Sequence, residues 1–288
     1  MRLDVLTGAL DDEFGTRLVQ DDDWADVFGQ CYPDPYWREF AEPGWEGRWN
    51  GLMVRGSGEV ARAVTCVFPS DGVVAGLEPG TLLFSEHPVD FADEPGFLPL
   101  SRASFETMRA RGISFYNVHA PIDQHPRISP SRMCADAIGL TGVEEYFPID
   151  PAIPGGCAVV GDSDRTIEEV AELLSSWLGN EVPVTVVSRH RPAAGRVTVV
   201  GGGGTDRELL EASLERGCQT YVTGGAVTRC RVEIVQRMLR EFLDLAQAEG
   251  VSVIDATHYG TEMPPQLAMV DWFQQRGLPA RFQPDGPK

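Results

Sequence analysis

The chain has 288 residues, of which 42% are hydrophobic and 23% are charged. These values are typical of a folded globular protein with a substantial core, and the length accommodates two compact halves. The 43 acidic residues outnumber the 24 basic ones and give a formal net charge of −19, which would repel a nucleic-acid backbone. No apolar run approaches the roughly 20 residues that a membrane span requires. The composition therefore excludes nucleic acid and membrane as expected partners.

The cysteines and the N-terminal sequence predict a cytoplasmic protein. The first residues, MRLDVLTGALDDEF, include acids where a signal peptide would have a basic start and a long apolar segment. The six cysteines are widely spaced without a CxxC motif, and a chain of this length does not depend on disulfides. We therefore expect reduced thiols.

The predicted elements become regular only after the first 60 residues, where we expect one short helix near 11–20 and otherwise loops. From residue 62 onward, short apolar runs alternate with helical stretches. The runs that are typical of buried or half-buried strands are 62–68, 81–87, 113–119, 157–161, 182–188, 196–202, 219–225 and 251–258.

Four helices have recognisable ends. Asp164 can cap a helix with an apolar stripe from Ile167 to Leu178, and Thr205 with Glu208 forms the pattern of a capping box. The second helix should end near 216, a third should span about 228–249, and a fourth should follow Pro264-Pro265 and end near 277.

This alternation predicts an α/β fold with a layered architecture and mixed, largely parallel sheets in two related halves. The Pro-rich stretch 147–156 marks a boundary between residues 1–150 and 151–288.

Three of the five histidines close apolar runs, and each is followed three or four residues later by an acid. The pairs are His87 with Asp90, His119 with Asp123, and His258 with Glu262. Ligand sites in α/β proteins gather at the carboxyl ends of strands, and imidazoles with carboxylates there could hold Zn, Mn or Fe. The alternative is that each histidine is an ordinary polar residue at the edge of a core. His125 and His190, in Pro- and Arg-rich loops, are expected to face solvent.

The glycine run 201–204 links a predicted strand to a predicted helix. Such a turn could bind an anion at the helix N-terminus, or it could serve only as a tight connection. The run matches neither GxGxxG nor GxxxxGK[ST]. No GxSxG motif occurs, so the sequence offers no support for serine-based catalysis.

In order and spacing, these motifs resemble the NIF-three-like dinuclear metal-centre family, many of whose members are labelled GTP cyclohydrolase I type 2 homologues. The resemblance runs from about residue 60 to 285 and extends to DDDWADVFG (21–29). Its motifs are SEHP (85–88), HAPID (119–123), the glycine-rich turn, the Thr-Gly strand end of QTYVTGG (219–225) and HYGTE (258–262).

The resemblance implies two divalent metal ions (Zn, Mn or Fe) held by four residues: His87, Asp123, His258 and Glu262. It places Glu86 where the family has a further histidine, as an additional ligand or a general base, and His119 as a ligand or an orienting residue. This chain also departs from the family at Ala120-Pro121, which replaces Thr-Asn, and at Gly225, which replaces Glu.

The implied activity is that of a metal-dependent hydrolase acting on a purine or a related cyclic amide or amidine, a small-molecule substrate that includes nucleotides. The family also implies a homo-hexamer. Two alternatives stay open. One is a non-catalytic metal-binding protein for metal delivery, regulation or an oligomeric scaffold, and the other is a nucleotide-binding regulator that uses the glycine-rich turn.

Overall fold

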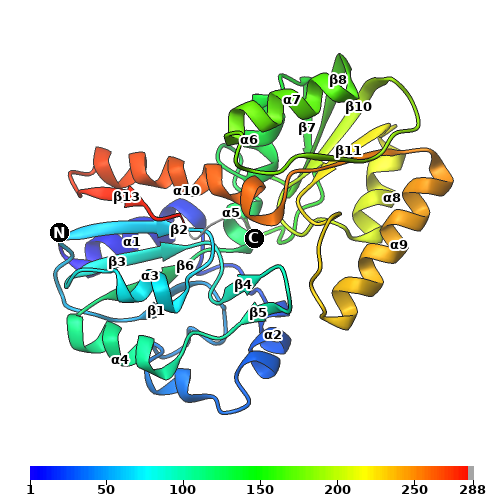
Figure 1. Ribbon diagram of the computed structural model, residues 1–288. Helices are drawn as coiled ribbons and strands as arrows, with labels where there is room; N and C mark the ends of the chain where they lie inside the picture. The colour runs from blue at the N-terminus through cyan, green and yellow to red at the C-terminus, as the bar shows by residue number, and fades with distance from the viewer. Residues whose placement is uncertain (285–288) are drawn as a thin grey trace. The chain divides into compact units, whose positions relative to one another are not determined.

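The computed structural model describes residues 1–284 of the protein, which form two compact units. Unit 1 comprises Met1–Ala92, Phe97–Ile122 and residues 266–284, and unit 2 comprises Asp93–Gly96 and Asp123–Pro265. Figure 1 shows the elements in chain order. His87 therefore belongs to unit 1 and Asp123 to unit 2. The division into an N-terminal half, 1–150, carrying His87 and Asp123, and a C-terminal half, 151–288, carrying His258 and Glu262, stays a prediction.

Unit 1 is built on a five-stranded sheet with the order β1-β6-β3-β2-β13. Its strands are β1 (Gly51–Val54), β2 (Arg62–Cys66), β3 (Thr81–Ser85), β6 (Ser114–Asn117) and β13 (Ala280–Phe282). The pairs β13–β2, β2–β3 and β3–β6 are parallel, and only β1 runs antiparallel to its neighbour β6. Because β3 and β6 are parallel neighbours, the residues that follow them emerge at the same edge of this sheet.

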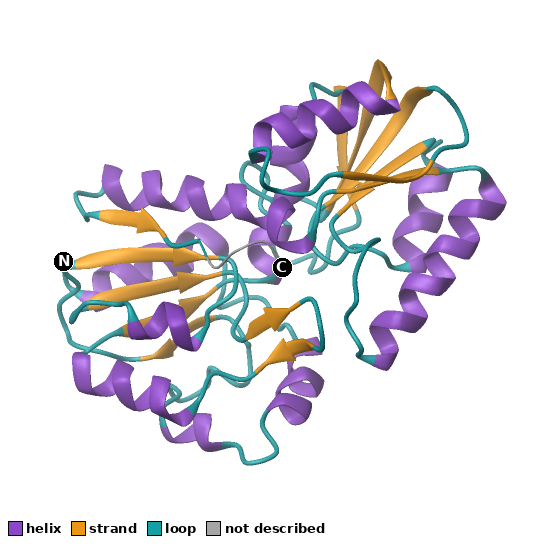
Figure 2. Ribbon diagram, viewed as in Figure 1, coloured by secondary structure: helices purple, strands orange, loops and turns teal. Residues whose placement is uncertain are grey.

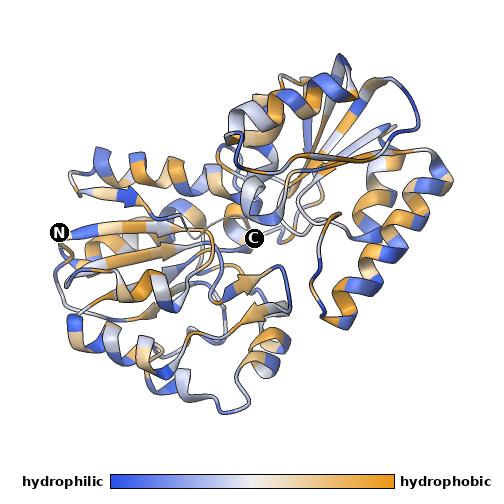
Figure 3. Ribbon diagram, in the orientation of Figure 1, coloured by the Kyte–Doolittle hydropathy of each residue, from blue (hydrophilic) through white to orange (hydrophobic). Residues whose placement is uncertain are grey.

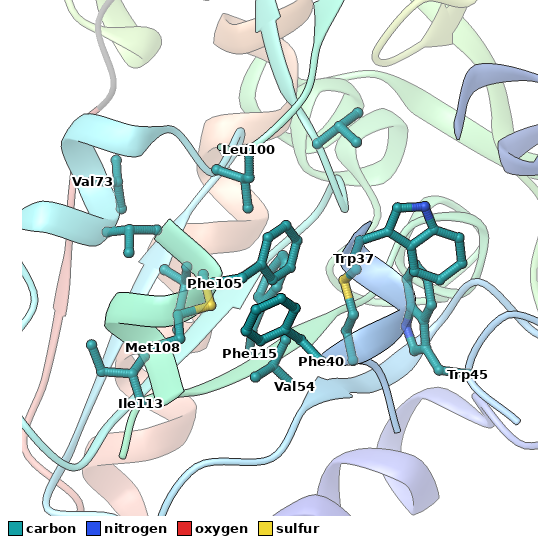
Figure 4. Packing of buried hydrophobic residues seen from close by; sticks show 14 of the residues in the cluster. Trp37, Phe40, Trp45, Val54, Val73, Leu100, Phe105, Met108, Ile113 and Phe115 are labelled. Carbon is teal, nitrogen blue, oxygen red and sulfur yellow. The ribbon is translucent and has the colours of Figure 1, made fainter. Parts of the chain in front are cut away.

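Both faces of this sheet are covered, because successive side chains of a strand point to opposite faces. Leu83 packs in a cluster with Phe105 and Met108 of α4, and Figure 4 shows the aromatic packing of that cluster. Phe84, the next residue of β3, instead contacts Phe14 and Phe273. The helices and short strands in this part of the chain are α1 (Leu3–Phe14), α2 (Asp23–Cys31), a 3-10 helix (Tyr36–Glu39), α3 (Asp71–Ala75), β4 (Asp90–Ala92), β5 (Gly96–Leu98), α4 (Arg102–Arg111) and α5 (Ala120–Asp123).

Unit 2 contains a six-stranded mixed sheet with the order β7-β8-β10-β11-β12-β9. The strands are β7 (Thr141–Tyr146), β8 (Ala158–Thr166), β9 (Thr185–Ser188), β10 (Ala193–Val200), β11 (Thr220–Thr223) and β12 (Ser252–Asp255). The three strands β10, β11 and β12 are parallel, and the remaining pairs are antiparallel (Figure 2). The carboxyl ends of β10, β11 and β12 therefore lie together at one edge of the sheet.

Helices cover both faces of the unit 2 sheet. Val199 packs with residues of α6 (Pro130–Ala137) and α7 (Ile167–Leu178), and Val200 packs with residues of α8 (Arg207–Glu215) and α9 (Glu233–Glu249). In Figure 3 both α7 and α9 carry hydrophobic and hydrophilic residues along their length, as expected for helices with one buried face. The last helix is α10 (His258–Gln275).

The structure confirms the mixed α/β fold and all eight predicted strands. It corrects several helix ends. The first helix spans Leu3–Phe14 and not 11–20, and α7 is capped by Thr166, whose capping box with Glu169 replaces the expected Asp164 cap. The helix predicted from residue 228 begins at Glu233. Among residues 1–284, no helix has both the length and the apolar character that crossing a membrane would need.

The largest correction concerns α10. It begins at His258 and continues through Pro264 and Pro265, although their missing N–H groups remove two i→i−4 hydrogen bonds. The expected start after the prolines is therefore wrong. The consequence for the site is that His258 and Glu262 stand one turn apart on the same helix.

Candidate functional site

Two histidines follow neighbouring strands in unit 1. His87 lies two residues after β3 and His119 two residues after β6, and their ring centroids are 5.0 Å apart. Phe68 stacks on His87 with centroids 4.4 Å apart, and Trp24 meets both imidazoles edge-on. The His87 side chain is 1% exposed. The expectation that strand ends bring these histidines together is therefore correct within this unit.

Asp21 is the hydrogen-bond partner of His119. The Nδ1 atom of His119 lies 2.8 Å from Oδ2 of Asp21, and the same oxygen accepts the Ala120 N–H at 3.2 Å. Burial by itself would raise the pKa of the Asp21 carboxyl, but the charge and hydrogen bond of His119 and the Ala120 N–H together lower that pKa below its usual 3.8. Asp21 is therefore a buried carboxylate that accepts a hydrogen bond from the imidazole.

Glu86 is fully buried in unit 1 and is held by Gln266. The Gln266 Nε2 donates to Glu86 Oε2 at 3.1 Å, and the Gln266 main-chain oxygen accepts from the Thr65 hydroxyl at 2.9 Å. Buried carboxylates require such donors, because desolvation penalises the charged form. Gln266 thus orients the Glu86 carboxylate.

In unit 2, Glu262 lies close to two other side chains of metal-ligating type. His258 and Glu262 are separated by one turn of α10, and His258 Nε2 lies 2.8 Å from Glu262 Oε1. Asp123 and Glu262 offer carboxylate oxygens within 4.8 Å of one another. Glu262 is 1% exposed, whereas Asp123 and His258 are half-buried. Imidazole and carboxylate groups are ligand types that Zn, Mn and Fe take in proteins, so each of these two pairs could contribute to a cation site.

Glycine at position 202 makes room for this donor set. Gly202 has a left-handed backbone with φ of +64°, and a Cβ there would lie 2.4 Å from Glu262 Oε1 and 3.5 Å from His258 Nε2. Its N–H donates to the Thr261 hydroxyl at 2.8 Å, which fixes the turn against the start of α10. The glycine-rich turn therefore lets the backbone approach the two side chains closely.

Asp255, at the end of β12, organises the same edge of the unit 2 sheet. Its carboxylate accepts the N–H groups of Ala226, Val227 and Thr257 at 2.6, 3.0 and 3.0 Å. Burial raises the pKa of this carboxyl, and the three N–H donors oppose the shift. Through these bonds Asp255 ties the loop after β11 to the turn that presents His258.

Comparison with known proteins places this arrangement in a family. The family model described as Duf34/NIF3 (NGG1p interacting factor 3) matches residues 38–280, which is most of the chain. The chain belongs to the DUF34/NIF3 family. The resemblance drawn from the sequence motifs is confirmed.

Named relatives of this DUF34/NIF3 protein are similar at low identity. The GTP cyclohydrolase 1 type 2 homolog of Escherichia coli (strain K12) is 23% identical over 232 residues, covering 78% of this chain and 84% of the relative. The homolog of the same name from Pyrococcus horikoshii is 26% identical over 218 residues, covering 74% and 79%.

Solved structures of this fold include the protein ybgI, described as of unknown function. It has a TM-score of 0.70 and 19% identity, with all of both chains covered. The protein TTHA1606 from Thermus thermophilus has a TM-score of 0.61 and 20% identity, covering 99% of this chain and all of the other. At these identities the similarity establishes the fold.

The turn 201–204 of this DUF34/NIF3 protein is not organised as an anion site at a helix N-terminus. Asp206 caps α8 with its own carboxylate, which accepts the N–H groups of Glu208 and Leu209 at 2.6 and 3.3 Å. The predicted capping box at Thr205 is therefore wrong, and an anion at this end of α8 would meet a carboxylate. The tight-connection alternative agrees better with these contacts.

Two further histidines, His125 and His190, were expected to face solvent, and only one of them does. His190 is exposed, as expected. His125 is 6% exposed, and its Nδ1 accepts the N–H groups of Arg127 and Ile128 at 3.2 and 3.3 Å, so it does not face solvent.

Sequence reasoning did not single out Asp21, Gln266 or Asp255 as site residues. Asp21 was within reach of the sequence, because it opens the segment DDDWADVFG that resembles the family's N-terminal motif. Gln266 carries no comparable signal, because it lies beyond the two prolines, 180 residues from its partner Glu86.

Proposed function

We propose that this DUF34/NIF3 protein is a metal-dependent hydrolase with two divalent metal ions, bound by His87, Asp123, His258 and Glu262. Its substrate class is a small purine or related cyclic amide or amidine, opened hydrolytically as the name of its relatives suggests. The same proposal includes a cytoplasmic homo-hexamer. The six cysteines, all free thiols, agree with a reducing compartment.

The observation that carries the proposal is the donor set of unit 2. Two carboxylates gathered this closely repel one another unless a proton or a cation balances their charge. The 2.8 Å distance between His258 and Glu262, with Asp123 close to Glu262, suits a site that a divalent cation completes. His87, stacked on Phe68 and contacted by Trp24, has a defined ring orientation, which a ligand needs.

Divalent ions, when bound, would polarise a substrate C=O or C=N group and make water a better nucleophile at neutral pH. The chain's own residues supply positioning and proton transfer. Glu86, buried and oriented by Gln266, serves as an additional ligand or as a general base. His119, oriented by Asp21, is the second candidate for acid–base work.

The protein's net charge of −19 affects the choice of substrate. A nucleotide would be repelled by the field of the chain, so its attraction would depend on the cations at the site. We therefore expect nucleotide binding to require metal, and equilibrium dialysis with GTP, with and without Mn²⁺, measures this directly.

The proposal is tested by metal content and turnover together. Elemental analysis of protein purified without chelator should find bound divalent metal, and His258→Ala should lose most of it while its circular dichroism spectrum is unchanged. His190→Ala, which alters an exposed histidine of the same unit, is the matched control and should keep its metal. Full metal content in His258→Ala would refute the ligand assignment.

Turnover is measured as the loss of purine absorbance of GTP, with cyclic amides as further substrates, after loading with Mn, Fe or Zn. Tight metal binding without hydrolysis of any of these compounds would favour the non-catalytic metal-binding role.

A further inference from the structure

We propose that Thr257 is a positioning residue for His258, and that the protein accepts backbone strain at Thr257 in order to keep the Thr257 hydroxyl at the start of α10. The inference rests on the proposed metal-dependent function and deepens it, because it assigns a residue that supports the donor pair His258 and Glu262. All the residues on which it depends belong to unit 2.

Thr257 has a backbone conformation that a branched side chain disfavours. It lies two residues after β12 and directly before α10, and its φ is +62°. Among residues 1–284, the other non-glycine residues with positive φ are Trp49 and Phe147, so Thr257 is the one with a branched Cβ. The left-handed region brings Cβ close to a carbonyl oxygen, whereas glycine adopts this region without that clash. Threonine at this position must therefore supply something that glycine cannot.

What threonine supplies is a hydrogen-bond acceptor for the first turn of α10. The Thr257 Oγ1 accepts the N–H of Gly260 at 3.0 Å. This N–H belongs to the helix-start donors that have no partner within the helix. Gly260 is buried, and a Cβ at its position would lie 2.9 Å from the same oxygen. The hydroxyl and the first turn are therefore packed directly against each other.

The main chain of Thr257 is held as firmly as its side chain. Its N–H donates to Asp255 Oδ1 at 3.0 Å, and its carbonyl oxygen accepts the N–H and the hydroxyl of Thr261, each at 3.1 Å. A Cβ at Gly224 would lie 2.4 Å from that carbonyl oxygen, so the loop after β11 packs closely against it. Backbone strain persists only where the surrounding structure imposes it, and here contacts act on all three polar groups of Thr257.

These contacts determine where His258 lies. His258 is the first residue of α10, and Glu262 follows one turn later with its Oε1 2.8 Å from His258 Nε2. Rotation about the Thr257 backbone bonds would move both side chains relative to Gly202, whose N–H is bonded to the Thr261 hydroxyl at 2.8 Å. Functional constellations tolerate displacements of only about 0.5 Å. The Thr257 hydroxyl therefore acts on the donor pair through the start of the helix.

The alternative is that this hydroxyl only caps α10 and adds stability. Thr166 offers a comparison, because it caps α7 with the same chemistry: its Oγ1 accepts the N–H of Glu169 at 3.2 Å, but its φ is an ordinary −73°. Thr166 pairs with Ala193, the first residue of β10, so it lies at the sheet edge opposite to the carboxyl ends of β10, β11 and β12. Thr166→Val is thus a matched control that loses a threonine cap away from the donor pair.

The experiment compares three variants of Thr257 in the full chain. Thr257→Val keeps the branched Cβ and loses the hydroxyl, Thr257→Gly relieves the strain and loses the hydroxyl, and Thr257→Ser keeps the hydroxyl. By isothermal titration calorimetry, the valine and glycine variants should bind Mn²⁺ about tenfold more weakly than the wild type, and the serine variant should restore the affinity. Thr166→Val should lower the midpoint of urea denaturation and keep the wild-type Mn²⁺ affinity.

A second measurement does not depend on metal. The ring ¹H and ¹⁵N NMR signals of His258 in the metal-free protein, identified by their loss in His258→Ala, report the contact of this ring with Glu262. At a fixed pH these signals should shift in Thr257→Val and Thr257→Gly. They should stay at their wild-type positions in Thr257→Ser and in Thr166→Val.

Two results would overturn the inference. One is wild-type Mn²⁺ affinity or unchanged His258 signals in Thr257→Gly, because the hydroxyl would then serve only as a cap; glycine adopts the required φ, so this variant remains informative if Thr257→Val does not fold. The other is an equal loss of Mn²⁺ affinity in Thr166→Val, because a general loss of stability would then explain the effect. Failure of the wild type to bind Mn²⁺ would instead refute the proposed function, and the metal-free His258 signals would still decide whether Thr257 positions this ring.

Discussion

Replacing Gly202 with alanine tests whether the glycine-rich turn exists to accommodate the metal donors. The new Cβ would lie 2.4 Å from Glu262 Oε1, whereas ordinary van der Waals contact begins at 3.4 Å. The Glu262 carboxylate must therefore retreat by about 1 Å, which is several times the tolerance of about 0.2 Å in metal–ligand distances. We expect Gly202→Ala to weaken binding of Mn²⁺ or Zn²⁺ by roughly 10- to 100-fold.

The same substitution also affects stability. An alanine at φ of +64° costs about 1 kcal/mol or slightly more in backbone strain. The displaced buried carboxylate of Glu262 and its disturbed contact with His258 add about 1–3 kcal/mol. The expected loss is therefore about 2–4 kcal/mol in the free energy of unfolding, measured by urea denaturation of the metal-free protein.

Gly250→Ala is the matched control. Gly250 ends α9 with φ of +65°, nearly the same backbone angle, but a Cβ there would meet nothing within 4 Å. This variant should lose only the strain energy of about 1 kcal/mol and should bind metal like the wild type. If Gly202→Ala matched Gly250→Ala in both stability and metal affinity, the close approach of the turn to Glu262 would have no functional meaning.

Three further predictions concern unit 1 chemistry, its core and the thiols. The pKa of Asp21 is lowered in the folded protein, so its stabilising contribution should be fully present above pH 3.8 and should be lost as the pH falls further. The free energies of unfolding of wild type and Asp21→Asn, measured by urea titration, should therefore converge in acid. Asn117→Ala should lower the free energy of unfolding by about 2–4 kcal/mol, because it removes two buried hydrogen bonds. Asn117 accepts one from the Trp45 indole at 2.9 Å and donates the other to the Trp49 carbonyl oxygen at 2.7 Å. A loss below about 0.5 kcal/mol in urea denaturation would contradict this prediction. Burial raises the pKa of the Cys134 thiol to about 12, so this thiol should resist a thiol reagent near pH 8 until the protein unfolds. The half-buried Cys31 should react first. Peptide mapping of the labelled protein shows which of the two cysteines has reacted.

The sequence alone determined the layered α/β fold and the histidines worth examining. Strand and helix periodicities are local, so the eight predicted strands and the apolar stripe of α7 could be read from residue order. The pair His258 and Glu262 was singled out by its spacing, but the helix that joins the two residues was not predicted, because the expected helix began only after Pro264-Pro265. The exact helix ends were harder to predict from the sequence. Thr166 lies near Asp164, and Asp206 lies next to Thr205, and all four are residue types that can cap a helix. The backbone geometry decides that Thr166 and Asp206 are the caps.

Only the tertiary structure decided how the site residues are supported. Asp21 and His119 are 98 residues apart, and Glu86 and Gln266 are 180 apart. No local pattern encodes such hydrogen bonds, because they depend on how strands and loops pack into one unit. The need for glycine at position 202 likewise follows from a distance to Glu262 that only the folded chain defines.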